Sequence, residues 1–195
     1  MAGAQYAAMN NPQTILELLA RKGAMAYEGE GISQIAHAWQ CGQLARAARA
    51  TQALQLASWL HDLGHLLTDL SGSPTTQGID DRHEQLGANM LDAIWGPAVA
   101  EPVRLHVAAK RYLVATYPEY REKLSPDSVR SLALQGGPMD LEESVQFQAS
   151  PYALDAQQLR VWDETGKRPD WFARDTQQAL DELRALMDRV HFLPA

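Results

Sequence analysis

Apolar residues along this chain recur at the three- and four-residue spacing of amphipathic helices, whereas no run of alternating β-branched residues indicates a strand. Asn11 and Pro12 are a cap and a helix-starting proline, and Gly23 ends the helix that they open. Further helices are expected at about residues 32–50, 51–61, 82–95, 97–112, 152–165 and 170–190. The pattern therefore predicts an all-α protein.

Caps and breaks separate these helices. The stretch Thr68–Asp81 is rich in Ser, Gly, Thr, Pro and Asp, and we expect it to be a surface loop. Ser125 and Pro126 form a second pair of cap and proline ahead of a helix. A Gly-Gly-Pro break follows that helix, and Asp140 caps the short helix after it.

The composition is that of a soluble globular protein, with 46% hydrophobic and 21% charged residues in 195. No apolar run approaches the roughly 20 residues that a membrane span needs. The segment Met1–Asn11 has no basic flank before an apolar stretch, so no signal peptide is expected. Cys41 is the only cysteine and cannot form an internal disulfide, which favours a cytoplasmic location.

The charge balance argues against a nucleic-acid partner. The formal net charge is -7, and the 17 Lys and Arg residues form no basic stripe. An anionic substrate would therefore have to be collected by a local pocket. The basic residues are scattered or, like Lys110 and Arg111, lie next to candidate metal ligands.

The segment Ser58–His65, which reads Ser-Trp-Leu-His-Asp-Leu-Gly-His, is the most informative stretch of the chain. His61 and Asp62 are adjacent at the expected end of a helix, where both side chains can point at one metal ion. An imidazole and a carboxylate together suit hard or borderline divalent metals.

Four further residues of ligand type are spread along the chain: His37, His83, His106 and Asp163. Any one histidine taken alone is more often a core or surface residue. With the His-Asp pair they give four histidines and two carboxylates, enough for two metal ions with Asp62 as the bridge. The sequence therefore predicts a dinuclear metal centre.

Four other motifs accompany these residues: Tyr27-Glu-Gly-Glu30 and the segments His106–Leu113, Leu134–Asp140 and Arg160–Lys167. In this order, over roughly residues 12–170, the chain resembles the HD superfamily. It specifically resembles the small branch of mixed-valent diiron oxygenases that cleave 1-hydroxy-2-aminoethylphosphonates and are related to myo-inositol oxygenase. The His-Asp pair alone is weakly diagnostic of the reaction, and the other four motifs together are strongly so.

The resemblance implies an HD-domain helical bundle. It implies a single domain over residues 1–195, with a metal-binding core at about 30–167 and a C-terminal helix at about 170–190. One iron ion would be held by His37, His61, Asp62 and Asp163. The other would be held by Asp62, His83 and His106.

Substrate contacts follow from the same resemblance. The phosphonate would be bound by Lys110, Arg160, Ser128, Ser131 and His65. Tyr27 would cap an iron before the substrate arrives, and Glu30 would meet the ammonium group of the substrate. Catalytic roles would fall to His65, Lys110 and Tyr27.

Helical spacing agrees with two of these assignments. Lys110 lies one turn after His106, and Arg160 lies three residues before Asp163, so each cation shares a helix face with a ligand. Ordinary alternatives remain for the substrate residues. The cations can form solvated helix faces, the serines can be caps, Tyr27 and Glu30 can be loop residues, and Glu28 competes for the carboxylate role.

The implied reaction uses an Fe(II)/Fe(III) pair, with O2 as cosubstrate, to cleave the C–P bond of 2-amino-1-hydroxyethylphosphonate or its N-trimethyl analogue. The products would be phosphate and glycine or glycine betaine. Asp80 and Asp81 add negative charge that suits either nitrogen, although a helix cap is the default interpretation.

Two rival functions fit the same scaffold. A metal-dependent phosphohydrolase would use the same ligands on a small phosphate ester or nucleotide, but it would not need the Tyr27–Glu30 segment or the pair Lys110 and Arg160. A catalytically silent HD signalling module would have a degraded ligand set, and no expected ligand is missing here. The sequence predicts no oligomeric state.

Overall fold

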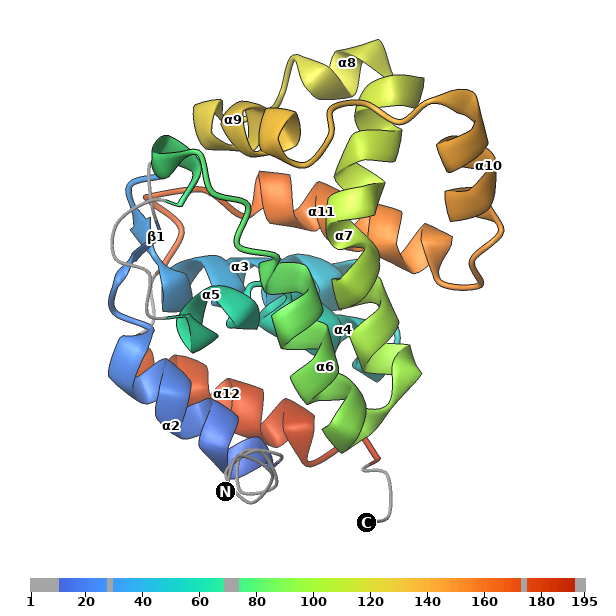
Figure 1. Ribbon diagram of the computed structural model, residues 1–195. Coiled ribbons are helices and arrows are strands. Elements are labelled where there is room, and N and C mark those ends of the chain that lie inside the picture. The colour runs from blue at the N-terminus through green and yellow to red at the C-terminus, as the bar shows by residue number, and fades with distance from the viewer. Residues whose placement is uncertain (1–10, 28–29, 69–73, 173–174, 192–195) are drawn as a thin grey trace, which may run out of the picture.

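The computed structural model describes residues 11–27, 30–68, 74–172 and 175–191 of the chain. Helices make up most of this part of the chain, as expected, and Figure 1 shows α3, α4 and α5 in the middle, with α2 and α12 below and α8, α9 and α10 above. In chain order they are α2 (Pro12–Lys22), α3 (Gln34–Ala47), α4 (Gln52–Leu60), α5 (Leu63–Leu67), α6 (His83–Trp95), α7 (Pro97–Thr116), α8 (Pro118–Arg121), α9 (Pro126–Leu134), α10 (Leu141–Gln148), α11 (Ala153–Thr165) and α12 (Thr176–Met187), with the 3-10 helix η1 (Thr75–Gln77).

The helix starts agree with the caps expected from the sequence. The side chains of Asn11 and Ser125 accept hydrogen bonds from the backbone N–H groups of Thr14 and Ser128. Asp140 forms a capping box with Glu143, because each side chain accepts from the backbone N–H of the other residue.

A short antiparallel hairpin corrects the prediction that the chain has no strands. Strand β1 (Ala26–Tyr27) pairs with β2 (Ile32–Ser33), so the helix expected at 32–50 begins at Gln34 instead. Two-residue strands are too short to produce an alternating pattern, so the periodicity could not predict them. Ser33 is the N-cap of α3, and its hydroxyl accepts from the N–H of Ala36.

Other elements also differ from the expected ones. The helices α5 and α8 were not predicted, and η1 lies inside the segment expected to be an irregular loop. Helix α12 spans Thr176–Met187, a shorter range than the 170–190 expected. None of the helices in the described part of the chain is both long and apolar enough to cross a membrane.

Two hydrophobic clusters form the interior. The larger cluster packs α2 to α6 and α12, and the smaller one packs α8, α9 and α10. Helices α7 and α11 belong to both, as Val103 and Leu159 lie in the larger cluster and Ala109 and Ala156 in the smaller. Figure 1 shows α7 running from the lower group of helices to the upper one. Buried polar side chains of these two helices therefore lie where the clusters meet.

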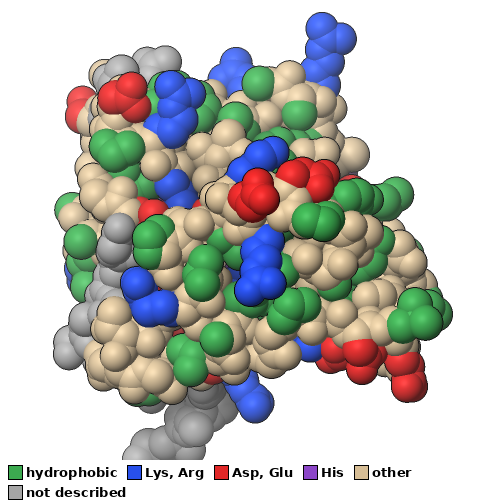
Figure 2. Space-filling view, turned by 90° about the horizontal axis from the view of Figure 1, so that it is seen from above, with side chains coloured by type: hydrophobic (Ala, Val, Ile, Leu, Met, Phe, Trp, Pro, Cys, Tyr) green, Lys and Arg blue, Asp and Glu red, His purple; other side chains and the backbone are tan. Residues whose placement is uncertain are grey.

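The end formed by α8, α9 and α10 carries a mixed surface. In Figure 2, basic, acidic and hydrophobic side chains are interspersed over this face of the described chain. Among the apolar side chains, Leu141 and Val145 of α10 and Leu154 of α11 are strongly exposed.

Candidate metal centre and substrate pocket

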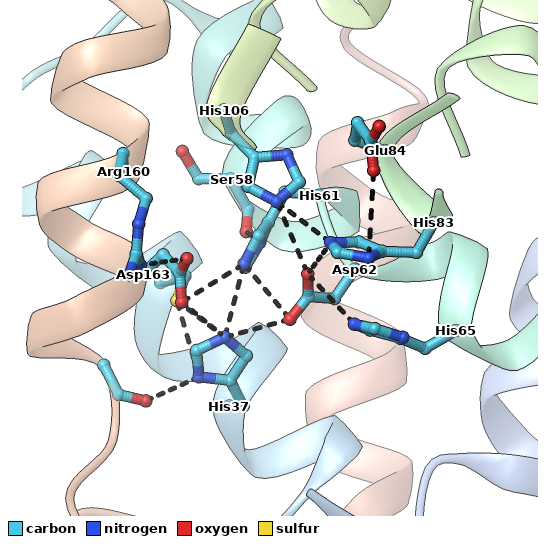
Figure 3. A network of polar contacts seen from close by, with 12 residues as sticks. His37, Ser58, His61, Asp62, His65, His83, Glu84, His106, Arg160 and Asp163 are labelled. Atoms are coloured by element: carbon cyan, nitrogen blue, oxygen red, sulfur yellow. Dashed lines mark hydrogen bonds and ion pairs between the residues drawn. The ribbon is translucent and has the colours of Figure 1, made fainter. Parts of the chain in front are cut away.

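Six buried ligand-type side chains from five parts of the fold converge on one point (Figure 3). Their sources are α3, the junction of α4 and α5, and helices α6, α7 and α11. They are the six residues expected from the sequence, namely His37, His61, Asp62, His83, His106 and Asp163. His61 ends α4 and Asp62 precedes α5, so the helix break directs both side chains inward.

One half of the centre combines two histidines with two carboxylates. The Nε2 atoms of His37 and His61 lie 3.3 Å apart. Oδ2 of Asp62 is 3.5 Å from the first and 3.4 Å from the second. Oδ1 of Asp163 is 3.4 Å and 3.6 Å from the same two nitrogens. These four atoms therefore surround a space of the size that one metal ion needs.

The other half uses the second oxygen of Asp62. Its Oδ1 is 3.5 Å from Nε2 of His83 and 3.9 Å from Nε2 of His106, and these two nitrogens are 3.2 Å apart. Each oxygen of one carboxylate thus faces a different pair of histidines. This is the arrangement of a carboxylate that bridges two metal ions.

Hydrogen bonds at the far side of the rings fix which nitrogen faces the centre. The Nδ1 atoms of His37, His61 and His106 lie 2.8, 3.0 and 2.7 Å from the carbonyl oxygens of Gly166, Ser58 and Val103. In a neutral imidazole that donates from Nδ1–H, Nε2 carries the lone pair. In this tautomer the inward nitrogens face one another at close range and would be acceptors available to a metal ion.

The centre as it stands has unsatisfied acceptors that a cation would satisfy. Oδ2 of Asp62 and Oδ1 of Asp163 are buried and accept no hydrogen bond from the described residues, and burying an unpaired carboxylate oxygen is costly. Although burial acts in the opposite direction, His61 and His37 hold the pKa of Asp62 well below its usual range, so it is ionised. The mixture of imidazole and carboxylate donors fits iron, manganese or zinc.

Asp81 orients two rings beside the centre. Its carboxylate accepts from Nδ1 of His65 at 2.6 Å and from Nδ1 of His83 at 2.9 Å. The two imidazoles stack with their centroids 3.8 Å apart. Asp81 also accepts weakly from the backbone N–H of His83, at 3.4 Å. The interpretation of Asp81 as a helix cap is therefore incomplete. Its position two residues before the candidate ligand His83 was the feature of the sequence that could have indicated its contact with that ring.

Tyr27 lies against the centre on strand β1. Its ring stacks on that of His37 with centroids 4.1 Å apart. Burial, and then the Asp62 carboxylate, raise the pKa of Tyr27 well above its usual value. The competing residue of the sequence interpretation, Glu28, lies outside the described residues.

A cavity opens onto the centre and is lined by both the candidate ligands and the candidate substrate residues. The expected residues among its lining are Tyr27, Asp62, His65, His83, His106, Lys110, Ser128, Ser131, Arg160 and Asp163. The structure therefore brings together nearly every site residue expected from the sequence. Glu30 is the exception among the substrate residues, because it does not line this cavity.

Lys110 and Arg160 form a cationic wall on the side of α7 and α11. Nζ of Lys110 donates to Oγ of Ser131 at 2.7 Å. Arg160 is paired with Asp163 and donates to Oγ of Ser128 at 3.1 Å. Ser128 and Ser131 are therefore the hydrogen-bond partners of the two cations, and Ser125, not Ser128, is the cap of α9.

Two residues of this wall were not singled out in the sequence. Lys167 lines the cavity, and its Nζ donates to Oγ of Ser128 at 2.9 Å. Glu164 is buried beneath it, 2.6 Å from Arg160 and 3.3 Å from Lys167. Lys167 closes the motif that begins at Arg160, so the motif contained a signal for it. Because Lys167 lies beyond the end of α11, helical spacing could not predict where its side chain points.

The chain resembles known proteins over most of its length. No protein-family model matches it. It is 35% identical to the 1-hydroxy-2-(trimethylamino)ethylphosphonate dioxygenase (glycine-betaine-forming) of Leisingera caerulea, over 87% of this chain and 86% of that protein. It is 36% identical to the hydroxymethylphosphonate dioxygenase of Gimesia maris, over 90% of this chain and 87% of that protein.

Proposed function

We propose that this chain uses O2 to cleave the C–P bond of a small 1-hydroxyphosphonate. The reason is that the chain belongs to the phosphonate-cleaving branch of the HD-domain oxygenases. Phosphate would be one product. With 2-amino-1-hydroxyethylphosphonate the other product would be glycine, and with its N-trimethyl analogue it would be glycine betaine. The relative that acts on hydroxymethylphosphonate adds that compound, which has no nitrogen, to the candidate substrates.

The ligand sets follow the two halves of the centre. His37, His61, Asp62 and Asp163 would hold one iron ion, and Asp62, His83 and His106 would hold the other. When bound, a mixed-valent Fe(II)/Fe(III) pair would supply Lewis acidity and the one-electron chemistry that a reaction with O2 needs. The neutral state of His106 favours this role, because burial, together with His83 and His61, lowers its pKa.

The cationic wall would bind the phosphonate. Lys110 and Arg160 are buried and line the same cavity as the ligands, and an arginine can bind such an anion through two N–H groups. Within the described residues, Nε of Arg160 is buried and makes no hydrogen bond of favourable geometry, which leaves it as a candidate donor to the anion. Ser128 and Ser131 would contribute hydroxyl groups to the same anion.

The remaining residues would orient the substrate and protect the centre. His65 lines the cavity, and its Nε2 lies 3.9 Å from Oδ1 of Asp62, so it would contact the phosphonate beside the metal pair. The stacked ring of Tyr27 would cap the His37 side of the centre until the substrate arrives. Glu30 would meet a positively charged nitrogen of the substrate.

The observation that carries this proposal is the bridging geometry of Asp62 inside a cavity whose wall holds two buried cations. A silent signalling module would not need this complete centre. The phosphohydrolase alternative would use the same ligands, but the two relatives described above are named dioxygenases and give it no support.

The test is phosphate release from the three hydroxyphosphonates by protein loaded with iron under anaerobic conditions, measured with and without O2. We expect release from at least one of them, and only when O2 is present. Release from ordinary phosphate esters without O2, and none from the phosphonates, would establish the phosphohydrolase instead.

A further inference from the structure

Glu30 and Lys167 form an ion pair beside the cavity. Nζ of Lys167 lies 3.3 Å from Oε1 of Glu30, and each side chain is only 9% exposed. The pair joins the segment after β1 to the segment after α11, which are far apart in the sequence. The same Nζ lies 6.0 Å from the centroid of the Tyr27 ring. Tyr27 and Glu30 therefore both lie close to the Lys167 ammonium.

The two members of the pair depend on each other unequally. Lys167 has other partners, because its Nζ also contacts Oε2 of Glu164 at 3.3 Å and Oγ of Ser128 at 2.9 Å. Within the described residues, Lys167 is the only cation paired with Glu30, and Oε1 of Glu30 is buried and accepts no hydrogen bond. Lys167 can thus release Glu30 and stay paired, whereas Glu30 needs a replacement cation.

Lys167 lines the cavity and is paired with Glu30, which does not line it. A positively charged nitrogen that binds Oε1 of Glu30 competes with the Lys167 ammonium for that oxygen. It also comes within a few ångströms of that ammonium, and like charges repel strongly at a buried site. A substrate without a charged nitrogen meets neither obstacle.

We propose that Lys167 is a specificity-determining residue, which competes with a cationic substrate nitrogen for the Glu30 carboxylate and so favours hydroxyphosphonates whose substituent is uncharged. This inference rests on the proposed function. It assigns a role in substrate selection to Lys167. The property of the substrate that Lys167 discriminates is the charge on the group next to the hydroxyl-bearing carbon.

The test compares substrate affinities in the absence of turnover. Calorimetric titration of iron-loaded protein without O2 gives the Kd of hydroxymethylphosphonate and of 2-amino-1-hydroxyethylphosphonate. Any general effect of Lys167 on the wall or on phosphonate binding changes both values and cancels in their ratio. We expect Lys167→Met to shift the ratio at least tenfold in favour of the aminophosphonate, and the ratio of kcat/KM values to shift in the same direction.

Two control variants separate charge from structure. Lys167→Arg keeps the cation beside Glu30 and is expected to retain the ratio of the unmodified protein within threefold. Lys123→Met removes an exposed lysine outside the cavity lining and is expected to leave the ratio unchanged. Lys167→Gln, whose amide can still donate to Ser128, replaces Lys167→Met if the methionine variant does not fold.

A double-mutant cycle identifies Glu30 as the group that Lys167 controls. In a Glu30→Gln background no carboxylate is left to compete for, and Lys167→Met relieves only the direct repulsion. We therefore expect the shift in the ratio to fall to threefold or less in that background. Equal shifts in the two backgrounds would overturn the competition.

The outcomes keep this inference apart from the proposed function. Oxygen-dependent phosphate release together with a ratio unchanged in Lys167→Met, or in its Gln replacement, overturns the role of Lys167 and leaves the function standing. If the unmodified protein neither binds the phosphonates nor releases phosphate from them, the proposed function fails, and the role of Lys167 is overturned with it.

Discussion

At the scale of single residues, Asp62 is the position on which the centre depends most. It is the only one of the six converging side chains whose two oxygens face different histidine pairs, at 3.4 to 3.5 Å on one side and 3.5 to 3.9 Å on the other. A histidine at this position would offer one inward nitrogen in place of two oxygens. A carboxylate is therefore the side chain that the proposed pair of ions would require at this position.

Asp62→Ala is expected to remove the metal pair, because both halves of the centre lose a ligand at once. The measurement is the iron content of protein reconstituted anaerobically. Asp80→Ala is a matched control, since Asp80 is an exposed carboxylate near the cavity mouth and faces neither histidine pair. A variant without Asp62 that still holds two iron ions would contradict the bridging role.

Lys110 is expected to make substrate binding dependent on pH. Burial, and then the positive charge of Arg160, lower its pKa to about 7. Above that pH the free protein holds a neutral amine, so binding of an anionic phosphonate has to take up a proton. Affinity should consequently fall as pH rises from 7 to 9, by up to about tenfold per pH unit.

The control for this prediction is Lys110→Arg, because a guanidinium stays charged over the whole range. The pH dependence of substrate affinity in Lys110→Arg reflects only the ionisation of the substrate and of the other groups of the protein. Anaerobic titrations of both proteins at several pH values give the difference that belongs to Lys110. Parallel profiles for the two proteins would contradict the lowered pKa.

At the scale of elements, the centre depends on the close approach of α5 and α6. A Cβ on Gly64 would lie 1.9 Å from the backbone oxygen of His83 and 2.7 Å from its Cα. The glycine between Asp62 and His65 therefore lets α5 contact the start of α6, where the rings of His65 and His83 stack. The close packing of α5 against α6 thus explains the glycine in the Leu-Gly-His part of the sequence motif.

Gly64→Ala is expected to lower the free energy of unfolding by about 3 kcal/mol, because the clash is with backbone and the helices have to separate. Metal content should also fall, as His83 moves with α6. Urea denaturation measures the first effect and iron analysis the second. Gly78→Ala is the comparison, since its Cβ meets nothing within 4 Å and only its φ of +72° is strained, at a cost of about 1 kcal/mol. Equal losses in the two variants would refute the close-packing explanation.

The sequence predicted local features well and long-range pairings poorly. Helix periodicity and the caps at Asn11, Ser125 and Asp140 depend on neighbours a few residues away, and these features match the structure. The contact of Lys167 with Glu30 joins opposite ends of the chain, and no local spacing encodes it.

The converging ligands were predictable for a different reason. Histidines are few in this chain, and most of them belong to one recurring pattern, so their meeting could be inferred without knowing the path of the chain. Serines and acidic residues are common and carry less information each. The roles of Asp81 and Glu164 therefore emerged only from the folded structure, where each contacts two ionisable partners.

At the scale of the whole molecule, the centre lies where the two hydrophobic clusters meet. Helices α7 and α11 run through both clusters and supply His106, Lys110, Arg160 and Asp163 at the junction. A junction of this kind can hold buried charge because the charged groups pair with one another, as Arg160 does with Asp163 and Glu164. Among the described residues, Oδ2 of Asp62 and Oδ1 of Asp163 are buried at the centre and accept no hydrogen bond.

Metal binding should therefore contribute to the stability of the whole fold. The proposed ligands come from α3, the α4–α5 junction, α6, α7 and α11, so a bound ion connects elements of both clusters and relieves the repulsion between facing acceptors. A ligand present at one hundred times its Kd stabilises the folded state by about 2.7 kcal/mol. For a chain of this size that corresponds to a rise in Tm of about 5–10 °C.

Thermal unfolding followed without O2, with and without Fe(II), measures this rise. Asp62→Ala should abolish it, because the chain then lacks the carboxylate that both halves share, whereas Asp80→Ala should show the full rise. The comparison separates binding at the centre from weak association of iron with surface carboxylates, which the two variants retain equally. If Fe(II) raised the Tm of Asp62→Ala as much as that of the unmodified protein, the stabilising ion would be bound elsewhere, and the centre could not be the link between the two clusters.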